Sequence, residues 1–337
     1  MPSAPIPFYP VLGPRQALGA RHGALPGALG APGAVRLRFA RTGLRLIAAT
    51  LDPGCRVLLP DLLCASAIEP FAAAGLRIDR YPVGPALEAD PSAVSEGLRT
   101  RTRAVVVVSY FGLPQPFAEL RALCEENDAL LIDDAAHSLL SELDGRPYGT
   151  LGHVGVVSAR KSLPVPDGAA AIGAHALPDD LPDANGDGAL RYLARTLARQ
   201  ADRVTGADLL GRRARRRSGL LPEGDGPRVP EATGWSRLTG RILVRVDPEA
   251  ERRLRRRVFA AWSPLVTGHG ASPVSAPDLA AGVGPSGYPL RVDDEALFAR
   301  RMQELRVEWI RWPDRPETCA THPRGVAVLP THTPPAG

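Results

Sequence analysis

Residues 130–138 read LLIDDAAHS, and this stretch says most about how the chain folds. It opens with an unbroken apolar run, which is typical of a strand buried on both faces of a sheet. Two carboxylates, Asp133 and Asp134, follow directly, and His137 comes three residues after Asp134. Ligands of open α/β sheets bind beyond the carboxyl ends of the strands. The stretch therefore predicts polar groups gathered at a ligand-binding edge of a sheet.

The same pattern recurs on both sides of this stretch. Short apolar runs alternate with segments of helical periodicity, and Pro and Gly residues separate them. Repeated β-α units of this kind predict an α/β fold with a mostly parallel sheet covered by helices on both faces. The expected strands are residues 56–59, 76–81, 104–108, 129–132 and 156–158, and the expected helices are residues 44–51, 64–74, 91–98 and 117–127.

Composition and periodicity divide the chain into three parts. Residues 1–37 are rich in Pro, Gly and Ala and are interpreted as an N-terminal arm. Residues 38–234 are expected to form a large ligand-binding domain with an Arg-rich linker at residues 212–234. Residues 235–337 are expected to form a smaller α+β C-terminal domain. The elements expected after the regular β-α units are helices at residues 190–203, 248–262 and 294–305 and strands at residues 288–292 and 307–311.

The basic residues are divided very unevenly. The 337 residues include 41 Lys and Arg, of which 40 are Arg and one is Lys161. Arg stays protonated, whereas Lys can lose its proton and act as an amine nucleophile. A position that keeps Lys where Arg serves everywhere else is a candidate for such chemistry. Taken alone, however, one Lys is explained equally well as a chance survivor on the surface.

Two further segments place polar groups at the predicted binding edge. Residues 156–161, VVSARK, are an apolar strand that ends at Ser158 and leads to Lys161. Arg41, Thr42 and Gly43 precede the helix expected at residues 44–51, and helix N-termini bind anions. These residues are the candidates for holding a phosphate group.

A single Lys, a strand-end Asp and a phosphate-type helix start together fit pyridoxal 5'-phosphate (PLP). A Lys amine forms an imine with the aldehyde of this cofactor. An Asp paired with the pyridine nitrogen keeps it protonated, so that the ring can accept electrons from a substrate carbanion. Hydroxyl and backbone N–H groups hold the phosphate dianion. The sequence thus predicts a PLP site in which Lys161 carries the cofactor.

Residues 132–138, IDDAAHS, resemble the EDAAQ segment of the DegT/DnrJ/EryC1/StrS family of fold-type-I PLP-dependent aminotransferases. Residues 149–155, GTLGHVG, and residues 167–170, DGAA, are similar to the stretches that precede and follow the family's lysine. The resemblance implies that Asp134 pairs with the pyridine nitrogen. It also implies that His137, which stands where Gln is common, packs near the ring or its O3′.

The resemblance, which is clear over residues 39–173, carries expectations about function. It implies an aminotransferase that acts on a keto sugar, free or nucleotide-linked, or on a related carbonyl compound, through an internal aldimine at Lys161. An amino donor is the implied second substrate, and the family implies a homodimer with the site at the subunit boundary. The expected setting is secondary metabolism or the formation of a surface polysaccharide.

Several positions depart from the family pattern. Ser158 and Lys161 are closer together than the family's serine and lysine, and residues 40–43, ARTG, replace the usual SGT turn. Residues 61–64, DLLC, lack the aromatic residue that commonly stacks on the cofactor. Two alternatives therefore stay open. One is a different PLP reaction on the same fold, such as dehydration, decarboxylation or cyclisation, and the other is a non-catalytic relative that senses a ligand or binds a partner.

Composition argues against several other classes of protein. A hydrophobic content of 44% with 23% charged residues is that of a globular chain. The four Cys residues lack the spacing of a zinc site or a disulfide framework, so no metal is expected. The Arg-rich runs at residues 212–217 and 252–257 lack interleaved aromatics and are interpreted as solvated faces rather than a nucleic-acid surface. No apolar run approaches the ~20 residues of a membrane span and no signal peptide is visible, so no membrane contact and a cytoplasmic location are expected.

Overall fold

The computed structural model describes residues 6–99, 101–173, 181, 191–194, 196–198, 201, 233–276, 278–313, 319 and 321–335. Within these residues the strands form a seven-stranded sheet, a four-stranded sheet and one two-stranded hairpin. Of the helix expected at residues 190–203, the described residues 191–194 and 196–198 are helical. The Arg-rich run at residues 212–217 lies outside the described residues.

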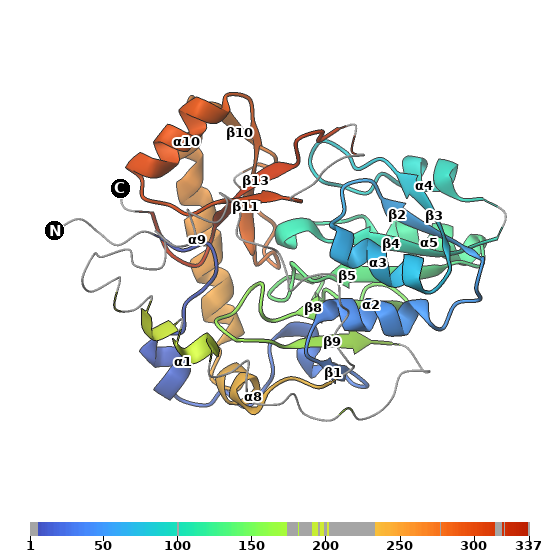
Figure 1. The fold of residues 1–337 in the computed structure, drawn as a ribbon, viewed down its shortest axis with the longest axis horizontal. Helices are drawn as coiled ribbons and strands as arrows, with labels where there is room; N and C mark the ends of the chain where they lie inside the picture. Colours follow the sequence, from blue (N-terminus) through green and yellow to red (C-terminus); the bar gives the residue numbers. More distant parts are fainter. Residues whose placement is uncertain are drawn as a thin grey trace.

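The large sheet has the strand order β1-β9-β8-β5-β4-β2-β3 (Figure 1). Strands β8, β5, β4, β2 and β3 are parallel to one another, β9 is antiparallel to β8, and β1 is antiparallel to β9. The predicted mostly parallel sheet is therefore confirmed. Two short strands, β9 and β1, extend it through antiparallel pairing. The bounds are β1 Val35–Leu37, β2 Arg56–Pro60, β3 Arg77–Tyr81, β4 Thr102–Val108, β5 Leu130–Ala135, β8 Val154–Ser158 and β9 Ala169–Ile172.

Helices cover both faces of the large sheet because its strands send alternate apolar side chains into two different cores. Val106 and Ile132 belong to one core, and their neighbours Val105 and Leu131 belong to the other. The helices of the first core are α2 (Ala40–Ala48) and α3 (Ala65–Ala73), and those of the second are α4 (Pro91–Gly97) and α5 (Phe117–Glu126). The helices expected between residues 44 and 127 are thus confirmed, with their ends shifted by a few residues.

The small sheet is antiparallel and has the strand order β10-β11-β13-β12. The long helix α9 runs from the neighbourhood of α8 at one end to that of α10 at the other (Figure 1). The strand expected at residues 307–311 begins later than predicted, as β12. The bounds are α8 Arg237–Leu243, α9 Pro248–Val266, β10 Ala271–Pro273, β11 Gly287–Val292, α10 Glu295–Glu304, β12 Ile310–Trp312 and β13 Val326–Pro330.

The remaining described elements are short. The N-terminal segment holds α1 (Pro14–Leu18) and the 3-10 turn η1 (Gly27–Gly30), and a second 3-10 turn, η2 (Tyr110–Gly112), follows β4. The two-stranded hairpin is formed by β6 (Glu142–Leu143) and β7 (Arg146–Pro147). None of the described helices is long and apolar enough to cross a membrane.

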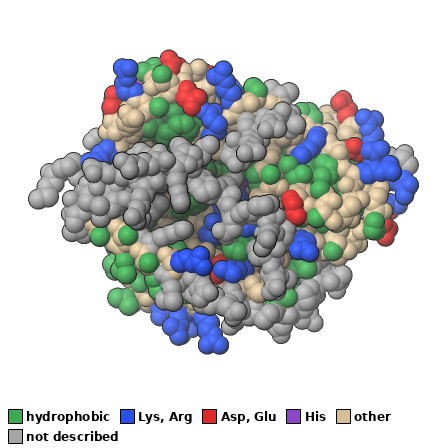
Figure 2. All heavy atoms as spheres, in the orientation of Figure 1, with side chains coloured by type: hydrophobic (Ala, Val, Ile, Leu, Met, Phe, Trp, Pro, Cys, Tyr) green, Lys and Arg blue, Asp and Glu red, His purple; other side chains and the backbone are tan. Residues whose placement is uncertain are grey.

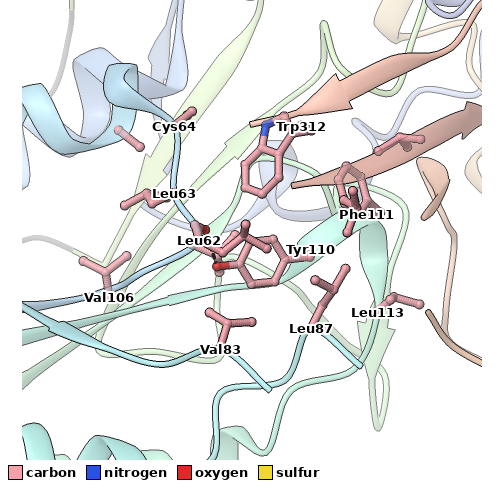
Figure 3. Packing of buried hydrophobic residues seen from close by; sticks show 14 of the residues in the cluster. Leu62, Leu63, Cys64, Val83, Leu87, Val106, Tyr110, Phe111, Leu113 and Trp312 are labelled. Carbon is pink, nitrogen blue, oxygen red and sulfur yellow. Dashed lines mark hydrogen bonds between the residues drawn. The ribbon is translucent and has the colours of Figure 1, made fainter. Parts of the chain in front are cut away.

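The large and the small sheet meet in one continuous hydrophobic core. Trp312 of β12 packs edge-on against Tyr110 and Phe111, with ring centroids 5.4 and 5.5 Å apart (Figure 3). Trp235 and Ile242 instead pack into the core on the other face of the large sheet. The division of the chain at residues 37 and 234 stays a prediction.

Candidate functional site

An open pocket lies where three parallel strands of the large sheet end. Val108, Asp134 and Ser158, which stand at or next to the last residues of β4, β5 and β8, line it together with Lys161. The pocket occupies the edge at which the sequence predicts ligand binding. The large sheet supplies one wall, and Trp312 of the small sheet supplies another.

Lys161 contacts His137 inside this pocket. The Lys161 Nζ lies 2.8 Å from the His137 Nε2, and the imidazole stacks on Phe111 at 4.9 Å with 7° between the ring planes. The ring of Trp312 packs edge-on against the imidazole at 5.1 Å and against Phe111 at 5.5 Å, so the three rings form one cluster. Burial and the nearby positive charge of Lys161 hold the pKa of His137 well below its usual range. The imidazole is therefore neutral, and its Nε2 can accept a hydrogen bond from a protonated Lys161.

The adjacent carboxylates Asp133 and Asp134 point to opposite faces of β5, because successive side chains of a strand alternate. Asp133 is fully buried away from the pocket and accepts hydrogen bonds from the N–H groups of Gly149, at 2.6 Å, and Leu151, at 3.2 Å. Asp134 lines the pocket and accepts a hydrogen bond from the Ala136 N–H at 3.1 Å. The structure thus gives the two acids different roles, and only Asp134 can meet a ligand.

Burial affects the two carboxylates in the same direction. It raises the pKa of Asp133 to about 7, against the lowering effect of the Gly149 and Leu151 N–H groups. It also raises the pKa of Asp134, whereas the positive charge of Lys161 lowers that pKa. A cationic ligand group beside Asp134 would favour its ionised form further.

The N-terminus of α2 borders the pocket, but its three candidate residues differ in position. Arg41 lines the pocket, and its guanidinium lies 5.3 Å from the ring centroid of Phe39. Thr42 is buried, and its Oγ1 has no hydrogen-bond partner among the described residues. Gly43 packs against the sheet, where an added Cβ would come within 2.8 Å of the Val156 Cγ1. Thr42 and Gly43 are not among the lining residues, so the geometry favours Arg41 over them as a ligand contact.

Several pocket residues are not evident from the sequence. Tyr9, Phe39, Arg160 and Trp312 all line the pocket. Arg160 lies 5.7 Å from the ring centroid of Phe39 and so belongs to the same group as Arg41. Arg160 and Phe39 carry a signal, since Arg160 stands directly before the single Lys and Phe39 two residues before Arg41, whereas Tyr9 and Trp312 come from segments distant in sequence.

The segment at residues 61–64 contributes aliphatic and thiol groups to the wall. Leu63 and Cys64 line the pocket, and the Cys64 Sγ lies 3.3 Å from the Ser66 Oγ. No aromatic side chain of this segment faces the pocket, as the sequence DLLC requires. Ring contacts in the pocket come instead from residues on other elements.

The residues present fit PLP. The pocket holds a Lys amine, the Asp134 carboxylate, the Ser158 hydroxyl and the Arg41 guanidinium, which match the aldehyde, the pyridine nitrogen and the phosphate of that cofactor. The His137 Nδ1 is buried without a hydrogen-bond partner among the described residues, which marks a polar group that a ligand could satisfy. Among the described residues there is no group of three His, Cys, Asp or Glu side chains that could hold a metal ion.

The basic residues of the described part do not form one continuous surface. On the face drawn in Figure 2, Arg side chains lie in several groups with acidic and apolar side chains between them. Helix α9 carries the Arg-rich run at residues 252–257. The sequence predicts that this run is a solvated face, but only part of it is exposed to solvent. Arg255 is buried, and Arg252 forms an ion pair with Glu142 at 2.8 Å, because the helix packs along the junction of the two sheets.

Comparison with known proteins finds a similarity to aminotransferases over part of the chain. Residues 42–173 match the model of the DegT/DnrJ/EryC1/StrS aminotransferase family. A dTDP-4-dehydro-2,3,6-trideoxy-D-glucose 4-aminotransferase from Saccharopolyspora spinosa is 30% identical over 125 residues, which are 35% of this chain and 31% of that protein. The matched region therefore spans about a third of the length of this curated relative.

Solved structures match over nearly the whole chain. The aminotransferase TlmJ from Streptoalloteichus hindustanus has a TM-score of 0.63 and 24% identity, and the match covers 96% of this chain and 87% of that one. An E. coli GDP-4-keto-6-deoxy-D-mannose-3-dehydratase with bound hydrated PLP has a TM-score of 0.60 and 13% identity over 89% of this chain and 83% of that one. These likenesses confirm the predicted fold, that of the fold-type-I PLP-dependent transferases.

The family model covers the β-α units that surround the pocket. The matched region begins at Thr42 in α2 and ends at Gly173, directly after β9. It includes Asp134, His137 and Lys161, so the resemblance of the IDDAAHS segment lies within the match. Over residues 42–173, this chain is similar to the DegT/DnrJ/EryC1/StrS aminotransferase family.

Proposed function

We propose that the protein is a PLP-dependent aminotransferase that acts on a keto sugar, free or nucleotide-linked, or on a related carbonyl compound. The observation that carries the proposal is the position of Lys161. The single Lys of an Arg-rich chain lies in the pocket at the strand ends, with Asp134 in the same pocket and His137 in contact with its amine. The assignment of the individual site residues belongs to this proposal.

Each residue has a distinct task in it. PLP, when bound, supplies an electron sink for the substrate carbon that loses a proton. The Lys161 Nζ would hold the cofactor covalently and would serve as the base that takes the proton of the substrate carbon and the acid that returns it. The Asp134 carboxylate keeps the pyridine nitrogen protonated, and Ser158, with Arg41, binds the phosphate. Thr42 and Gly43 are weaker candidates for the phosphate, because they do not line the pocket.

His137 has an orienting task. Its ring packs in one cluster with Phe111 and Trp312, and its neutral Nε2 faces the Lys161 amine. We assign to His137 the placing of this amine before the cofactor binds and a contact with the cofactor ring or its O3′ afterwards. The two neighbouring aromatic rings help to exclude water from the imidazole and keep it neutral.

The substrate class rests on charge and on the relatives. Arg41 and Arg160 both line the pocket and flank Phe39, which gives the pocket a cationic side suited to an anionic substrate such as a nucleotide-linked sugar. The curated relative is named as an aminotransferase of a dTDP-linked dehydro sugar.

A homodimer and a cytoplasmic location, both expected from the sequence, are further parts of the proposal. Analytical ultracentrifugation would test the first, and cell fractionation would test the second.

The attachment residue has a direct test. Purified protein mixed with PLP should show a visible absorption band from lysine-linked cofactor, and reduction with borohydride should leave the cofactor on the peptide that contains Lys161. The Lys161→Arg variant keeps the positive charge but loses the nucleophile, so it should show neither the band nor the labelled peptide. A band of undiminished intensity in Lys161→Arg would sink the proposal.

One observation favours a second candidate. Leu63 and Cys64 face the pocket where family members commonly place an aromatic residue against the cofactor, and a dehydratase is among the proteins of similar fold. The same residues would then serve dehydration, decarboxylation or cyclisation. Adding glutamate to the loaded protein distinguishes the two, because conversion to the pyridoxamine form supports transamination and its absence with every amino donor tried supports the second candidate. A failure to take up PLP at all would support a non-catalytic role instead.

A further inference from the structure

The Arg-rich helix α9 contains one arginine that is almost completely buried. Arg255 is 1% exposed, whereas its neighbour Arg256 is half-buried. Burying a guanidinium removes it from water, which is unfavourable unless its donors find partners. Burial lowers the pKa of Arg255, although the negative charge of Glu251 opposes this effect. The partners of Arg255 therefore matter.

The Arg255 guanidinium joins the lysine turn to the small sheet. Its Nη2 donates to the carbonyl oxygen of Ser162, the residue directly after Lys161. Its Nη1 donates to the Thr331 Oγ1 at 3.1 Å and to the Pro285 carbonyl at 3.4 Å. Pro285 precedes β11, and Thr331 follows β13. One side chain thus contacts the segment that carries the amine and two segments of the four-stranded sheet.

The lysine turn depends on this contact for its orientation. The N–H groups of Ser162 and Leu163 both donate to the Ala159 carbonyl, at 3.0 and 2.7 Å, so the backbone around Lys161 is a tight turn. The Ser162 carbonyl oxygen accepts a hydrogen bond from outside that turn, and the donor is the Arg255 guanidinium. Because the Lys161 side chain extends from the same turn, a rotation of the Ser162–Leu163 peptide, which carries this carbonyl, would shift the turn and move the amine away from His137.

We propose that Arg255 is a positioning residue for Lys161, and that it sets the place of the amine in the pocket according to the position of the small sheet. The contact acts before any cofactor is bound, so the placing of the amine does not depend on the proposed function. Its consequence for cofactor affinity rests on that function. The buried Arg of the run at residues 252–257 thereby has a task in the site, although its hydrogen-bond partners Ser162, Pro285 and Thr331 do not line the pocket.

Arg256 provides a matched control. It is in the same helix, and its guanidinium also donates to backbone carbonyls, those of Leu279, Ala280 and Val283. All of these belong to the segment between β10 and β11, and none is part of the lysine turn. Arg256→Gln therefore removes the same chemical group from the same helix and leaves the environment of Lys161 in place.

The experiment uses the fact that the chain has one Lys. Trace labelling of the cofactor-free full-length protein with an amine-reactive ester, read by mass spectrometry of the Lys161 peptide, reports the accessibility of this amine alone. Labelling of Arg255→Gln at a temperature well below its unfolding transition should be about tenfold faster than that of wild type, because one charge-assisted hydrogen bond no longer holds the turn. Arg256→Gln should label at the wild-type rate. Thr331→Val, which removes one partner of Arg255, should shift the rate in the same direction by a smaller factor.

Equal labelling rates in wild type, Arg255→Gln and Arg256→Gln would overturn the proposal, and so would equal increases in both variants. If Arg255→Gln does not fold, Thr331→Val carries the test alone, and an unchanged rate in that variant overturns the proposal. A PLP titration of the same proteins separates the two ideas. Wild type that binds no PLP contradicts the proposed function but leaves the labelling result valid, whereas a roughly tenfold weaker PLP affinity confined to Arg255→Gln and Thr331→Val supports both.

Discussion

At the scale of single residues, the neighbours Asp133 and Asp134 differ in role, one structural and one facing the pocket. Asp133 is buried on one face of the sheet, where two backbone N–H groups donate hydrogen bonds to one of its carboxylate oxygens. Asp134 faces the pocket with Lys161 nearby. A carboxyl group as buried as Asp133 holds its proton more tightly in the folded protein than in the unfolded chain.

The pKa of Asp133 predicts a specific dependence of stability on pH. The pKa is about 7 in the folded protein and 3.8 is its ordinary value, so the folded state binds more protons between about pH 4 and pH 7. The contribution of Asp133 to the free energy of unfolding is therefore full below about pH 4 and decreases as pH rises to about 7. A shift of this size corresponds to about 4 kcal/mol. Asp133→Asn, which cannot ionise, should lose this decrease.

The measurement is urea unfolding of wild type and variant at several pH values from 4 to 8. Asp144→Asn is the control, since Asp144 is exposed in the β6–β7 turn and has a positive φ of 50° that Asn tolerates. It should follow wild type at every pH. A difference between wild type and Asp133→Asn that stays constant with pH would contradict the assigned pKa.

Much of the candidate site could be predicted from residue patterns. Lys161, Asp134 and Ser158 all follow apolar runs, and parallel strands bring such ends to one edge of a sheet. The position of His137 in the pocket follows from its place five residues beyond the end of the apolar run. Trp312 could not be predicted in the same way, because only the packing of β12 against η2 brings it to a pocket built by strands more than a hundred residues earlier.

At the scale of elements, α2 is positioned by its close packing on the sheet. Gly43 lies in its first turns, and a Cβ there would approach the Val156 Cγ1 to 2.8 Å, the Leu37 Cδ1 to 3.1 Å and the Ala171 Cβ to 3.3 Å. The glycine lets the helix lie directly on β8, β9 and β1. The N-terminus of α2 can border the pocket only because the helix comes this close.

Gly43→Ala should therefore destabilise the protein. Overpacking of a well-filled core costs about 1–3 kcal/mol, which outweighs the gain in helix propensity of about 1 kcal/mol. Gly240→Ala is the matched control within α8, because its Cβ would have its nearest neighbour at 3.7 Å, and it should leave stability unchanged or slightly higher. Thermal unfolding of the cofactor-free variants measures both. Wild-type stability in Gly43→Ala would show that α2 is free to move away from the sheet.

The elements differ in how well their sequence predicts them. Strand β4 ends in four consecutive Val residues, and both its existence and its place in the interior of the sheet follow from that run. Strand β9 consists of three Ala, which have low strand propensity, and one Ile, with no period-2 pattern, so only its pairing with β8 defines it. Strand β1 has three residues and follows a Pro- and Gly-rich segment, which gives too short a pattern to read.

At the scale of the whole molecule, Trp312 connects the two sheets across the pocket. The ring is 1% exposed and contacts Tyr110 and Phe111, from the turn that follows β4, and His137, from the segment that follows β5. Figure 3 shows the indole lying between the 62–64 segment and Phe111. The small sheet therefore completes the pocket rather than merely packing beside it.

Trp312→Ala should lower the free energy of unfolding by about 3–5 kcal/mol, as large-to-small core substitutions of Trp do. It should also weaken PLP binding, because His137 loses one of the two rings that hold it. Trp309→Ala, a change of the same size in a half-buried residue that packs on Phe298, should cost less stability and leave PLP affinity unchanged. Urea unfolding and an absorbance titration measure the two effects. A Trp312→Ala variant with wild-type PLP affinity would contradict the role of the small sheet in the pocket.

The placement of Trp312 also has a consequence for the order of events during synthesis. Lys161 leaves the ribosome before Trp312 by 312 − 161 = 151 residues. At about 5–20 residues per second, this interval is on the order of ten seconds, during which the β-α units can fold but one wall of the pocket is missing. Arg255, which holds the turn of the amine, also arrives within this interval. The nascent chain should therefore be a poor acceptor of cofactor, and loading should follow release of the small sheet from the ribosome.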